Sequence, residues 1–495
     1  MIISQPKYIF APFILMLSNL VNAETISIGT VNNGDMKRMQ SLSSVFEKQH
    51  PDIKLEWVVL DEAVLRGQIT KDIAAESGKF DVITIGMYET PIWGKNNWLV
   101  PMDNLPASYD VDDIFNSVRQ GLSYQDKLYA LPFYGESSMT MYRKDLFEKA
   151  GLTMPDSPTW DFMAEAAAKI HDPDNGIYGA CLRGKAGWGE NMALLTTMIN
   201  AYGGRWFDMQ WQPQFESDEW KNALNQYLNI LTNYGPPAPY NNGFNENLSL
   251  MNKGHCGFWV DATVAGSFVM DKEQSNIVDK VGFTSAPHQV TSKGSSWLWS
   301  WALAVPVTSD AKEAAKTFTT WATSKAYLAL VAEKYGVIST PPGTRKSTYA
   351  NPEYMEQAPF AAVTLAEINS ADPTDSTLQE NPYTGIQFVA IPRFQSFASK
   401  VGKQISSILS GKTSIERGLM ISQKIVYRQM LRGKYIELQC VDNTQNPVIQ
   451  HTADTITAPQ TSNNESVEEA NIEVSTGNVV ETVEESVIST EAPVE

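Results

Sequence analysis

Aromatic residues that stand among polar side chains give this sequence its clearest chemical signal. The chain has 13 Trp, 19 Tyr and 19 Phe in 495 residues. Trp188 lies within the run RGKAGWGEN, and Trp297, Trp299 and Trp301 alternate in SSWLWSW. Aromatic rings pack against the C–H faces of a polyhydroxylated ligand, while carboxylates, amides and guanidinium groups bind its hydroxyls. These residue types together predict a binding site for a carbohydrate-like molecule.

Ten residues are candidates for that site because they stand in polar turns or beside these tryptophans: Asn32, Asn33, Asp35, Tyr88, Glu89, Glu136, Arg183, Trp188, Asn245 and Asp261. Asp35 could instead cap the helix that follows it, and Arg183 could belong to a structural ion pair. The alternating tryptophans could form one buried strand face, with one or two of them turned to a ligand. Five other tryptophans are expected to pack in the core, since they lie on periodic elements: Trp57, Trp98, Trp160, Trp220 and Trp321.

Several common catalytic and metal-binding motifs are missing from the sequence. There is no G-x-S-x-G, no G-x-G-x-x-G, no H-E-x-x-H and no C-x-x-C, and the five histidines are scattered. The tripeptide from Gly411 matches only the end of a phosphate-binding loop. A glycosidase remains possible, because glycoside hydrolysis needs only two carboxylates at a suitable separation.

The first part of the chain alternates between strand and helix patterns. Short runs rich in β-branched residues predict strands, and apolar residues at helical spacing predict the helices between them. Strands are expected at 25–31, 53–60 and 80–85, with helices at 36–50 and 64–77. A β-α-β-α-β order favours parallel strands with crossover helices, and therefore an α/β fold.

The rest of the chain is mostly helical, with strands in between. Further strands are expected at 129–133, 138–142, 257–260 and 299–305, and residues 134–137 are expected to connect the first two. The clearest helix patterns cover 160–170, 191–201, 218–232, 311–323, 325–334, 394–409 and 414–432. The run Pro341-Pro342-Gly343 predicts a stiff break in the chain.

The N-terminus resembles a secretory signal. Lys7 precedes an apolar run, and small residues end at Ala23, where a signal peptidase would cleave. An uncleaved anchor is the alternative, but the apolar run is shorter than the roughly 20 residues that span a bilayer. The mature chain is expected to begin at Glu24 in an oxidising compartment. Cys181 and Cys256 could pair there, leaving Cys440 over, although two buried free thiols would fit the sequence as well.

The C-terminal segment differs sharply in composition from the rest. Residues 436–495 contain twelve acidic residues and no Lys or Arg, within a chain of net charge -18. Such a segment is predicted to be disordered, either as a linker without a following domain or as an acidic interaction tail. Neither the segment nor the body has the clustered basic residues that a nucleic-acid surface needs.

Runs across the whole body resemble the extracellular solute-binding proteins of ABC carbohydrate importers, in the group that includes maltose-binding proteins. Within that group the sequence is most similar to the sorbitol/mannitol (polyol) binding proteins. The similar runs include TVNNGDMKRMQ from Thr30, FDVITIGMYETPIWG from Phe80, LPFYGESSMTMYRKDLFEKAGL from Leu131, CLRGKAGWGENM from Cys181, FWVDATVA from Phe258 and WLWSWALAVP from Trp297. The acidic tail has no counterpart in that pattern.

This resemblance implies a two-lobe periplasmic-binding-protein fold of type II, with discontinuous lobes, hinge strands and ligand in the interlobe cleft. One lobe would comprise 24–134 and about 297–341, and the other about 135–296 and 342–435. The chain would cross between lobes near Tyr134, within 287–296 and near Pro341. Motif matches carry over Asn33, Asp35, Tyr88, Glu89 and Glu136 as ligand-binding residues, and Arg183, Trp188, Asn245, Asp261 and Trp299 follow by position.

The function implied by the resemblance is capture of a polyol or related sugar in the periplasm by hinge closure. The loaded protein, expected to be a monomer, would deliver its ligand to a membrane permease that a separate ATPase powers. No cofactor, metal or catalytic residue is implied. The alternative is an exported glycoside hydrolase in which two of Asp35, Glu89, Glu136 and Asp261 act as acid and base.

Overall fold

The computed structural model describes residues 23–437. The predicted signal peptide and the predicted disordered tail lie outside these residues, except at their inner ends. Ile436, which the sequence assigns to the tail, is buried against the core, so the folded body extends at least that far. None of the helices within 23–437 is long and apolar enough to cross a membrane.

The first of two large sheets has the strand order β2-β1-β3-β11-β6. Its strands are β1 (Glu24–Val31), β2 (Ile53–Leu60), β3 (Val82–Gly86), β6 (Leu131–Glu136) and β11 (Trp299–Ala304). β1 pairs in parallel with β2 and β3, as the alternating pattern predicts. β11 enters from far along the chain and pairs antiparallel with both β3 and β6. Sequence periodicity therefore located these strands but not the insertion of β11.

The helix predicted at 36–50 is wrong as a single element. The structure has α1 (Gly34–Ser41) and α2 (Ser43–Gln49), separated at Leu42. The Ser41 hydroxyl donates to the Arg38 carbonyl at 2.7 Å, and serine side chains that bond to the backbone in this way compete with the helix. The next helix, α3 (Glu62–Ala75), starts directly after the strand β2 with only Asp61 between them.

The connection predicted at 134–137 is also wrong. β6 continues to Glu136, where Glu136 pairs with Trp299 and Gly135 with Ser300 of β11. Only Ser137 separates β6 from β7. Gly135 allows a close approach of two segments, because a Cβ there would overlap the Gly343 carbonyl.

The second large sheet has the order β10-β7-β9-β8. Its strands are β7 (Ser138–Arg143), β8 (Tyr178–Cys181), β9 (Cys256–Ala262) and β10 (Val281–Ser285). β9 lies between β7 and β8, antiparallel to the first and parallel to the second. A disulfide joins Cys181 of β8 to Cys256 of β9, with 5.7 Å between their Cα atoms. Of the two alternatives that the sequence left open, the structure has the bonded one.

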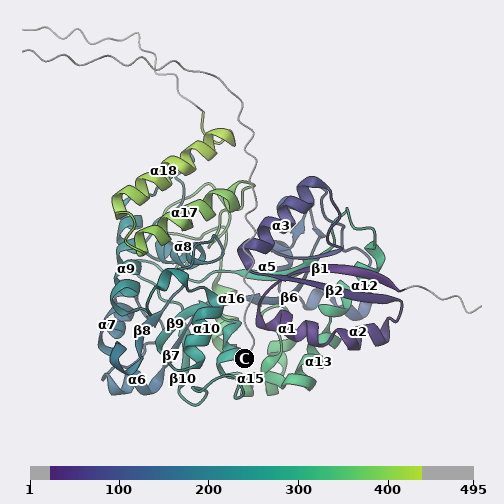
Figure 1. Cartoon of the computed structure of the whole chain (residues 1–495), viewed down its shortest axis with the longest axis horizontal. Helices are drawn as coiled ribbons and strands as arrows, with labels where there is room; N and C mark the ends of the chain where they lie inside the picture. Colours follow the sequence, from purple (N-terminus) through teal and green to yellow (C-terminus); the bar gives the residue numbers. More distant parts are fainter. Residues whose placement is uncertain (1–22, 438–495) are drawn as a thin grey trace, which may run out of the picture. The chain divides into compact units, whose positions relative to one another are not determined.

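Helices cover both sheets and follow the predicted ranges closely (Figure 1). Around the second sheet lie α6 (Lys144–Lys149), α7 (Trp160–Ile170), α8 (Asn191–Ala201), α9 (Asp218–Tyr234), α10 (Phe244–Asn252), α11 (Ala265–Val269) and α16 (Ala361–Ser370), while α17 (Phe394–Leu409) and α18 (Ile415–Arg432) pack against each other, α17 also against α8 and α9. Other helices are α4 (Glu89–Lys95), α5 (Asn116–Gly121), α12 (Lys312–Ala322), α13 (Lys325–Tyr335), α14 (Lys346–Ala350) and α15 (Pro352–Gln357). A short strand pair, β4 (Ser123–Tyr124) and β5 (Lys127–Leu128), completes the elements.

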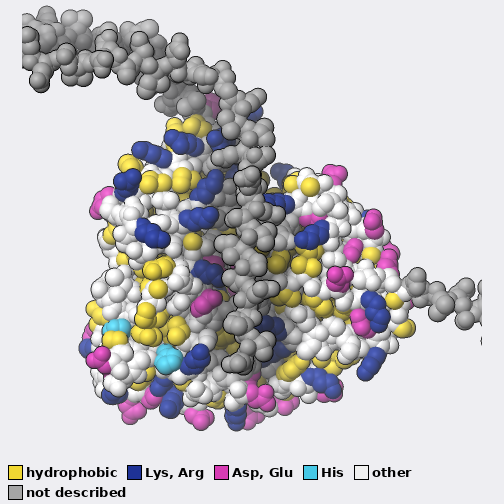
Figure 2. Space-filling model, in the orientation of Figure 1, with side chains coloured by type: hydrophobic (Ala, Val, Ile, Leu, Met, Phe, Trp, Pro, Cys, Tyr) yellow, Lys and Arg dark blue, Asp and Glu magenta, His cyan; other side chains and the backbone are white. Residues whose placement is uncertain are grey.

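The surface charge is uneven in a way that the segment counts missed. Lys and Arg side chains gather over α17 and α18 in the view of Figure 2. Lys400, Lys403, Arg417, Lys424 and Arg428 are all exposed there. The packing of α17 against α18 brings basic residues of both helices into one region, so a body that is acidic in sum still carries a basic surface.

Candidate functional site

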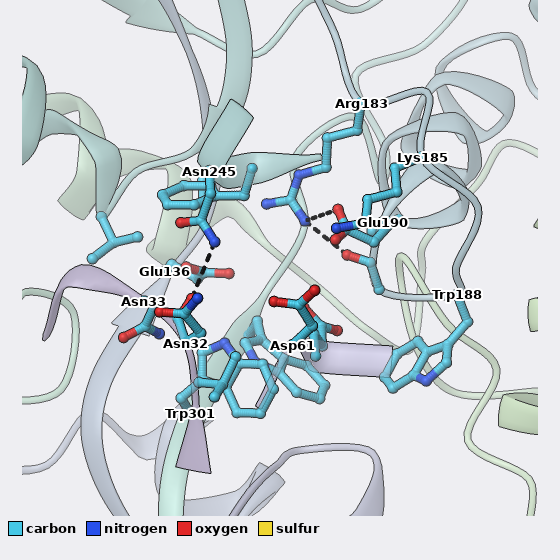
Figure 3. A pocket seen from close by; sticks show the side chains of 18 of the residues that line it. Asn32, Asn33, Asp61, Glu136, Arg183, Lys185, Trp188, Glu190, Asn245 and Trp301 are labelled. Carbon is cyan, nitrogen blue, oxygen red and sulfur yellow. Dashed lines mark hydrogen bonds and ion pairs between the residues drawn. The ribbon is translucent and has the colours of Figure 1, made fainter. Parts of the chain in front are cut away.

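A cavity of about 80 Å³ receives residues from both large sheets and from the segments that follow their strands. Asn33 follows β1, Glu136 ends β6, and Trp299 and Trp301 lie on β11. From the other side come residues 183–190, after β8, and the first turn of α10. Figure 3 shows Glu136, Asn33, Asp61, Arg183, Glu190 and Asn245 arranged around one central space. Strand ends in α/β proteins commonly meet in such a crevice.

Arg183 and Asp261 form a buried ion pair behind one wall of the cavity. The Arg183 Nε lies 2.9 Å from Asp261 Oδ2, and its Nη2 lies 2.5 Å from Oδ1. Asp261 also accepts hydrogen bonds from the Trp259 indole and from the Ala262 backbone amide. Nη1 of Arg183 donates to the Gly189 carbonyl at 2.7 Å, which ties the loop after β8 to the sheet. Asp261 raises the pKa of Arg183 above its ordinary value despite burial, so the guanidinium stays charged.

Glu136 is the buried acid that lacks such a partner. Its side chain is 7% exposed and lines the cavity, and no residue of 23–437 hydrogen-bonds to its carboxyl group. Burial raises the pKa of Glu136 to about 8, opposed by Arg183 and reinforced by the nearby carboxylates of Asp261, Glu62 and Asp35. A carboxyl group held in this way can accept hydrogen bonds from the hydroxyl groups of a bound molecule.

Glu190 is a second carboxyl group with spare hydrogen-bonding capacity. Burial is the largest cause that raises its pKa to about 7, and Arg183 opposes that shift. Its Oε2 lies 3.7 Å from Arg183 Nη1, without a hydrogen-bond partner in the described chain. The indole nitrogens of Trp188 and Trp297 are likewise buried and unpaired among the described residues. Glu136 and Glu190 therefore line the cavity with carboxyl groups that can still form hydrogen bonds, which suits hydroxyl groups.

Polar groups also connect the two sides of the cavity. The Asn245 amide, on α10, donates to the Asn32 carbonyl at 3.1 Å, and the dashed line between them is visible in Figure 3. Asn33 donates to the Tyr134 hydroxyl at 3.1 Å and accepts from the Met36 amide at 2.9 Å. Asn33 thus caps α1, a role that the sequence had left open for Asp35.

Arg66 on α3 stands at the centre of the tryptophan wall. Its guanidinium carbon lies 4.2 Å from the Trp188 ring centroid, 4.6 Å from that of Trp301 and 5.2 Å from that of Trp299. Its Nε donates to Glu62 at 3.0 Å and its Nη1 to Glu89. Both acids raise the pKa of Arg66 in opposition to burial, so the cation is retained within the aromatic cluster.

Six of the ten predicted site residues line the cavity: Asn33, Glu136, Arg183, Trp188, Asn245 and Trp299. Whether each of them touches ligand stays a prediction. All three alternating tryptophans, Trp297, Trp299 and Trp301, face the cavity rather than one or two of them.

The other four predicted residues lie behind the cavity wall. Asp35 pairs with Arg38 at 3.6 Å, and burial raises its pKa to about 6. Tyr88 donates to the Ile391 carbonyl at 3.0 Å. Glu89 binds Arg66, and Asp261 binds Arg183. These residues hold neighbours of the cavity in place.

Sequence reasoning missed several polar and aromatic lining residues: Asp61, Glu62, Arg66, Tyr134, Lys185, Glu190, Phe244, Glu246 and Gln387. Asp61 and Glu62 had a signal, since they directly follow the carboxyl end of β2, where ligands bind in α/β sheets. Lys185 and Glu190 stand in the same run as Trp188. Gln387 had no signal, because it comes from an irregular segment far along the chain.

Of the tryptophans expected to pack in the core, some are buried and one lies at the surface. Trp160 and Trp220 are fully buried, but Trp98 is 37% exposed and lies on the surface.

Within the described residues, no group of three or more His, Cys, Asp or Glu could hold a metal ion. Of the four carboxylates considered for glycoside hydrolysis, only Glu136 lines the cavity, so the predicted acid–base pair does not assemble.

The fold and the cavity define a two-lobed α/β binding protein of the type II periplasmic class. The sequence profile of the bacterial extracellular solute-binding protein family matches residues 32–329. The chain belongs to this family, whose members bind solutes rather than transform them. It is 57% identical, over 83% of its length and 94% of the relative's, to a mannitol-binding protein of Pseudomonas aeruginosa.

Solved structures support the same fold. An ABC transporter solute-binding protein of Agrobacterium vitis with bound D-mannitol matches with a TM-score of 0.82 and 54% identity, covering 83% of this chain and 99% of that chain. Maltose-bound MalE3 of T. maritima matches with a TM-score of 0.70 and 20% identity, covering 82% of this chain and 100% of that chain. The second likeness concerns the fold alone.

Proposed function

We propose that this chain binds mannitol or a closely related polyol in the periplasm and delivers it to an ABC permease. The observation that carries the proposal is the 54% identity to a solved binding protein with bound D-mannitol, over 99% of that chain. The mannitol-binding relative of P. aeruginosa supports the same ligand. A polyol carries a donor and an acceptor on each hydroxyl, which matches a wall with carboxyl groups that can still form hydrogen bonds.

The size of the cavity supports a small ligand. About 80 Å³ is several times the 10–15 Å³ that one water molecule needs, yet it is small for a chain of several sugar rings. Charge supports a neutral ligand, because Asp61, Glu136 and Glu190 face the cavity while Arg66 and Arg183 are already paired with acids. An anionic sugar acid would meet acidic groups, while these two arginines are already paired with acids.

The lobes proposed from the sequence are 24–134 with about 297–341, and about 135–296 with 342–435. The distribution of strands between the two sheets supports this division, since β11 joins the first sheet although it follows β10 of the second. Two of the proposed crossings touch, because the Gly135 amide donates to the Pro342 carbonyl at 2.8 Å. We propose that they act together as the hinge.

The proposed location rests on the family, which is extracellular, and on residues 1–23 acting as a cleaved signal. The bonded cysteines Cys181 and Cys256 support an oxidising compartment. The protein is proposed to act as a monomer.

Isothermal titration of the mature chain with mannitol, sorbitol, ribitol, glucose and maltose tests the proposal. We expect micromolar or tighter affinity for at least one hexitol, equivalent to about -8 kcal/mol or below. Binding of maltose without binding of any polyol would contradict the proposed ligand class. Hydrolysis of a glycoside would contradict transport.

A further inference from the structure

We infer that Arg66 makes the site selective for open-chain polyols over pyranose sugars, an inference that rests on the proposed function. The guanidinium covers ring faces that a sugar ring would otherwise use. It lies over the rings of Trp188, Trp299 and Trp301 at 4.2, 5.2 and 4.6 Å from their centroids. A pyranose binds to tryptophan by laying its flat C–H face on the ring. A cation already occupies that position here.

The remaining surroundings of Trp188 leave little ring face for stacking. Its ring packs against Tyr88, Trp299 and Phe394 at centroid distances of 5.2, 5.7 and 5.9 Å. Trp188 is only 4% exposed. Because Arg66 and these rings enclose it, the tryptophan lines the cavity with little free ring face. An extended chain of hydroxyl groups needs no free ring face, whereas a flat ring stacks on one.

Arg66 is held rigidly in this position. Glu62 accepts a hydrogen bond from its Nε and Glu89 accepts one from its Nη1. The residue is only 6% exposed. No residue of 23–437 accepts a hydrogen bond from its Nη2. A planar guanidinium that is fixed by two acids and three rings keeps its remaining N–H groups aimed at one place. These N–H groups can donate to the hydroxyl oxygens of an acyclic ligand at the cavity wall.

Two variants of Arg66 test the inference. Arg66→Lys keeps the charge but loses the planar group that stacks on the rings. Arg66→Met/Glu89→Gln removes the cation together with one acid that would otherwise be left unpaired. Arg345→Lys is the matched control, because Arg345 is also buried, lies 4.7 Å from the Tyr109 ring centroid and pairs with Asp113, but does not line the cavity.

The measurement is the ratio of the dissociation constants for D-mannose and D-mannitol, by titration calorimetry, with thermal unfolding of each variant. We expect mannitol to bind at least tenfold more tightly than mannose to the wild type. That ratio should fall at least fivefold in both Arg66 variants and stay unchanged in Arg345→Lys. Folded Arg66 variants with the wild-type ratio would overturn the inference, and so would failure of both variants to fold, which would make Arg66 a structural residue. A wild type that binds no polyol would instead overturn the proposed function, before any variant is compared.

Discussion

Replacing Glu136 by glutamine should stabilise the unliganded protein while weakening its binding. Burial raises the pKa of Glu136 from 4.5 to about 8. The folded state therefore holds a proton there that the unfolded state releases, and stability falls as the pH rises from 4.5 to 8. Each pH unit in this window costs about 1.4 kcal/mol, so ionisable Glu136 costs about 3 kcal/mol at pH 7 and about 5 kcal/mol above pH 8. Opening of the lobes would hydrate the carboxyl group, which makes these figures upper limits.

Ligand should act on Glu136 in the opposite direction. An ionised carboxylate accepts from two or more hydroxyl groups, whereas a protonated one has less accepting capacity. Binding should therefore favour the ionised form, release a proton below pH 8 and tighten as the pH rises towards 8. Glutamine can accept at only one oxygen and carries no charge, so we expect Glu136→Gln to weaken binding by about 2 kcal/mol and to remove most of this pH dependence.

Two measurements between pH 5 and 9 test this reasoning: the thermal midpoint without ligand, and mannitol titration in buffers of different ionisation enthalpy. Glu367→Gln is the control, because burial also raises the pKa of Glu367, but its side chain accepts from Ser296 and does not line the cavity. That variant should leave affinity unchanged. The reasoning is refuted if Glu136→Gln lowers the midpoint at pH 8, or binds mannitol within twofold of the wild type.

Four further substitutions test the structure of the folded body. Cys256→Ala removes a disulfide that spans 75 residues and should lower the free energy of unfolding by about 4 kcal/mol, measured by denaturant titration against the oxidised wild type. Gly135→Ala should lower the thermal midpoint and weaken mannitol binding, because its Cβ would overlap the Gly343 carbonyl. Gly67→Ala is the control: its Cβ would meet nothing within 4 Å on helix α3, so this variant should raise the midpoint. Trp188→Ala should reduce both stability, by about 3–5 kcal/mol, and affinity; loss of stability with wild-type affinity would place this tryptophan in the core alone.

Sequence periodicity predicted the elements wherever a single chain segment determines them. Helices α7 and α8 and strand β2 have the predicted bounds, because their apolar residues repeat with the period of the element that buries them. The errors fell where distant residues decide. Residues 134–137 are expected to connect two strands, but pairing with β11 keeps Gly135 in a strand. The break at Leu42 interrupts a run whose apolar spacing is helical throughout, so periodicity does not register it.

The residues that line the cavity could be predicted only in part, because distant segments also decide which side chains face it. Residue types pointed to Trp188, Glu136 and Asn245, because aromatic and polar groups in glycine-rich turns rarely serve a core. Spacing could not separate residues that face the cavity from those one layer behind it. Asp261 and Arg183 have equal claims in the sequence, yet only the arginine lines the cavity while the aspartate holds it. That distinction depends on which side of a strand faces the other lobe.

The buried acids of the cavity differ from two buried arginines elsewhere in the described chain, which are fully engaged by partners. Arg143 and Arg345 are buried but bound to carbonyl groups and aspartates. At the cavity, by contrast, Glu136 has no partner and Glu190 keeps one free oxygen. Each unpaired group destabilises the closed protein by the cost of desolvating it. A bound polyol would supply the missing hydrogen bonds, so closure without ligand is opposed by the same groups that make closure with ligand favourable. Selectivity for the loaded state then follows from the residues that line the cavity, without any separate sensor of occupancy.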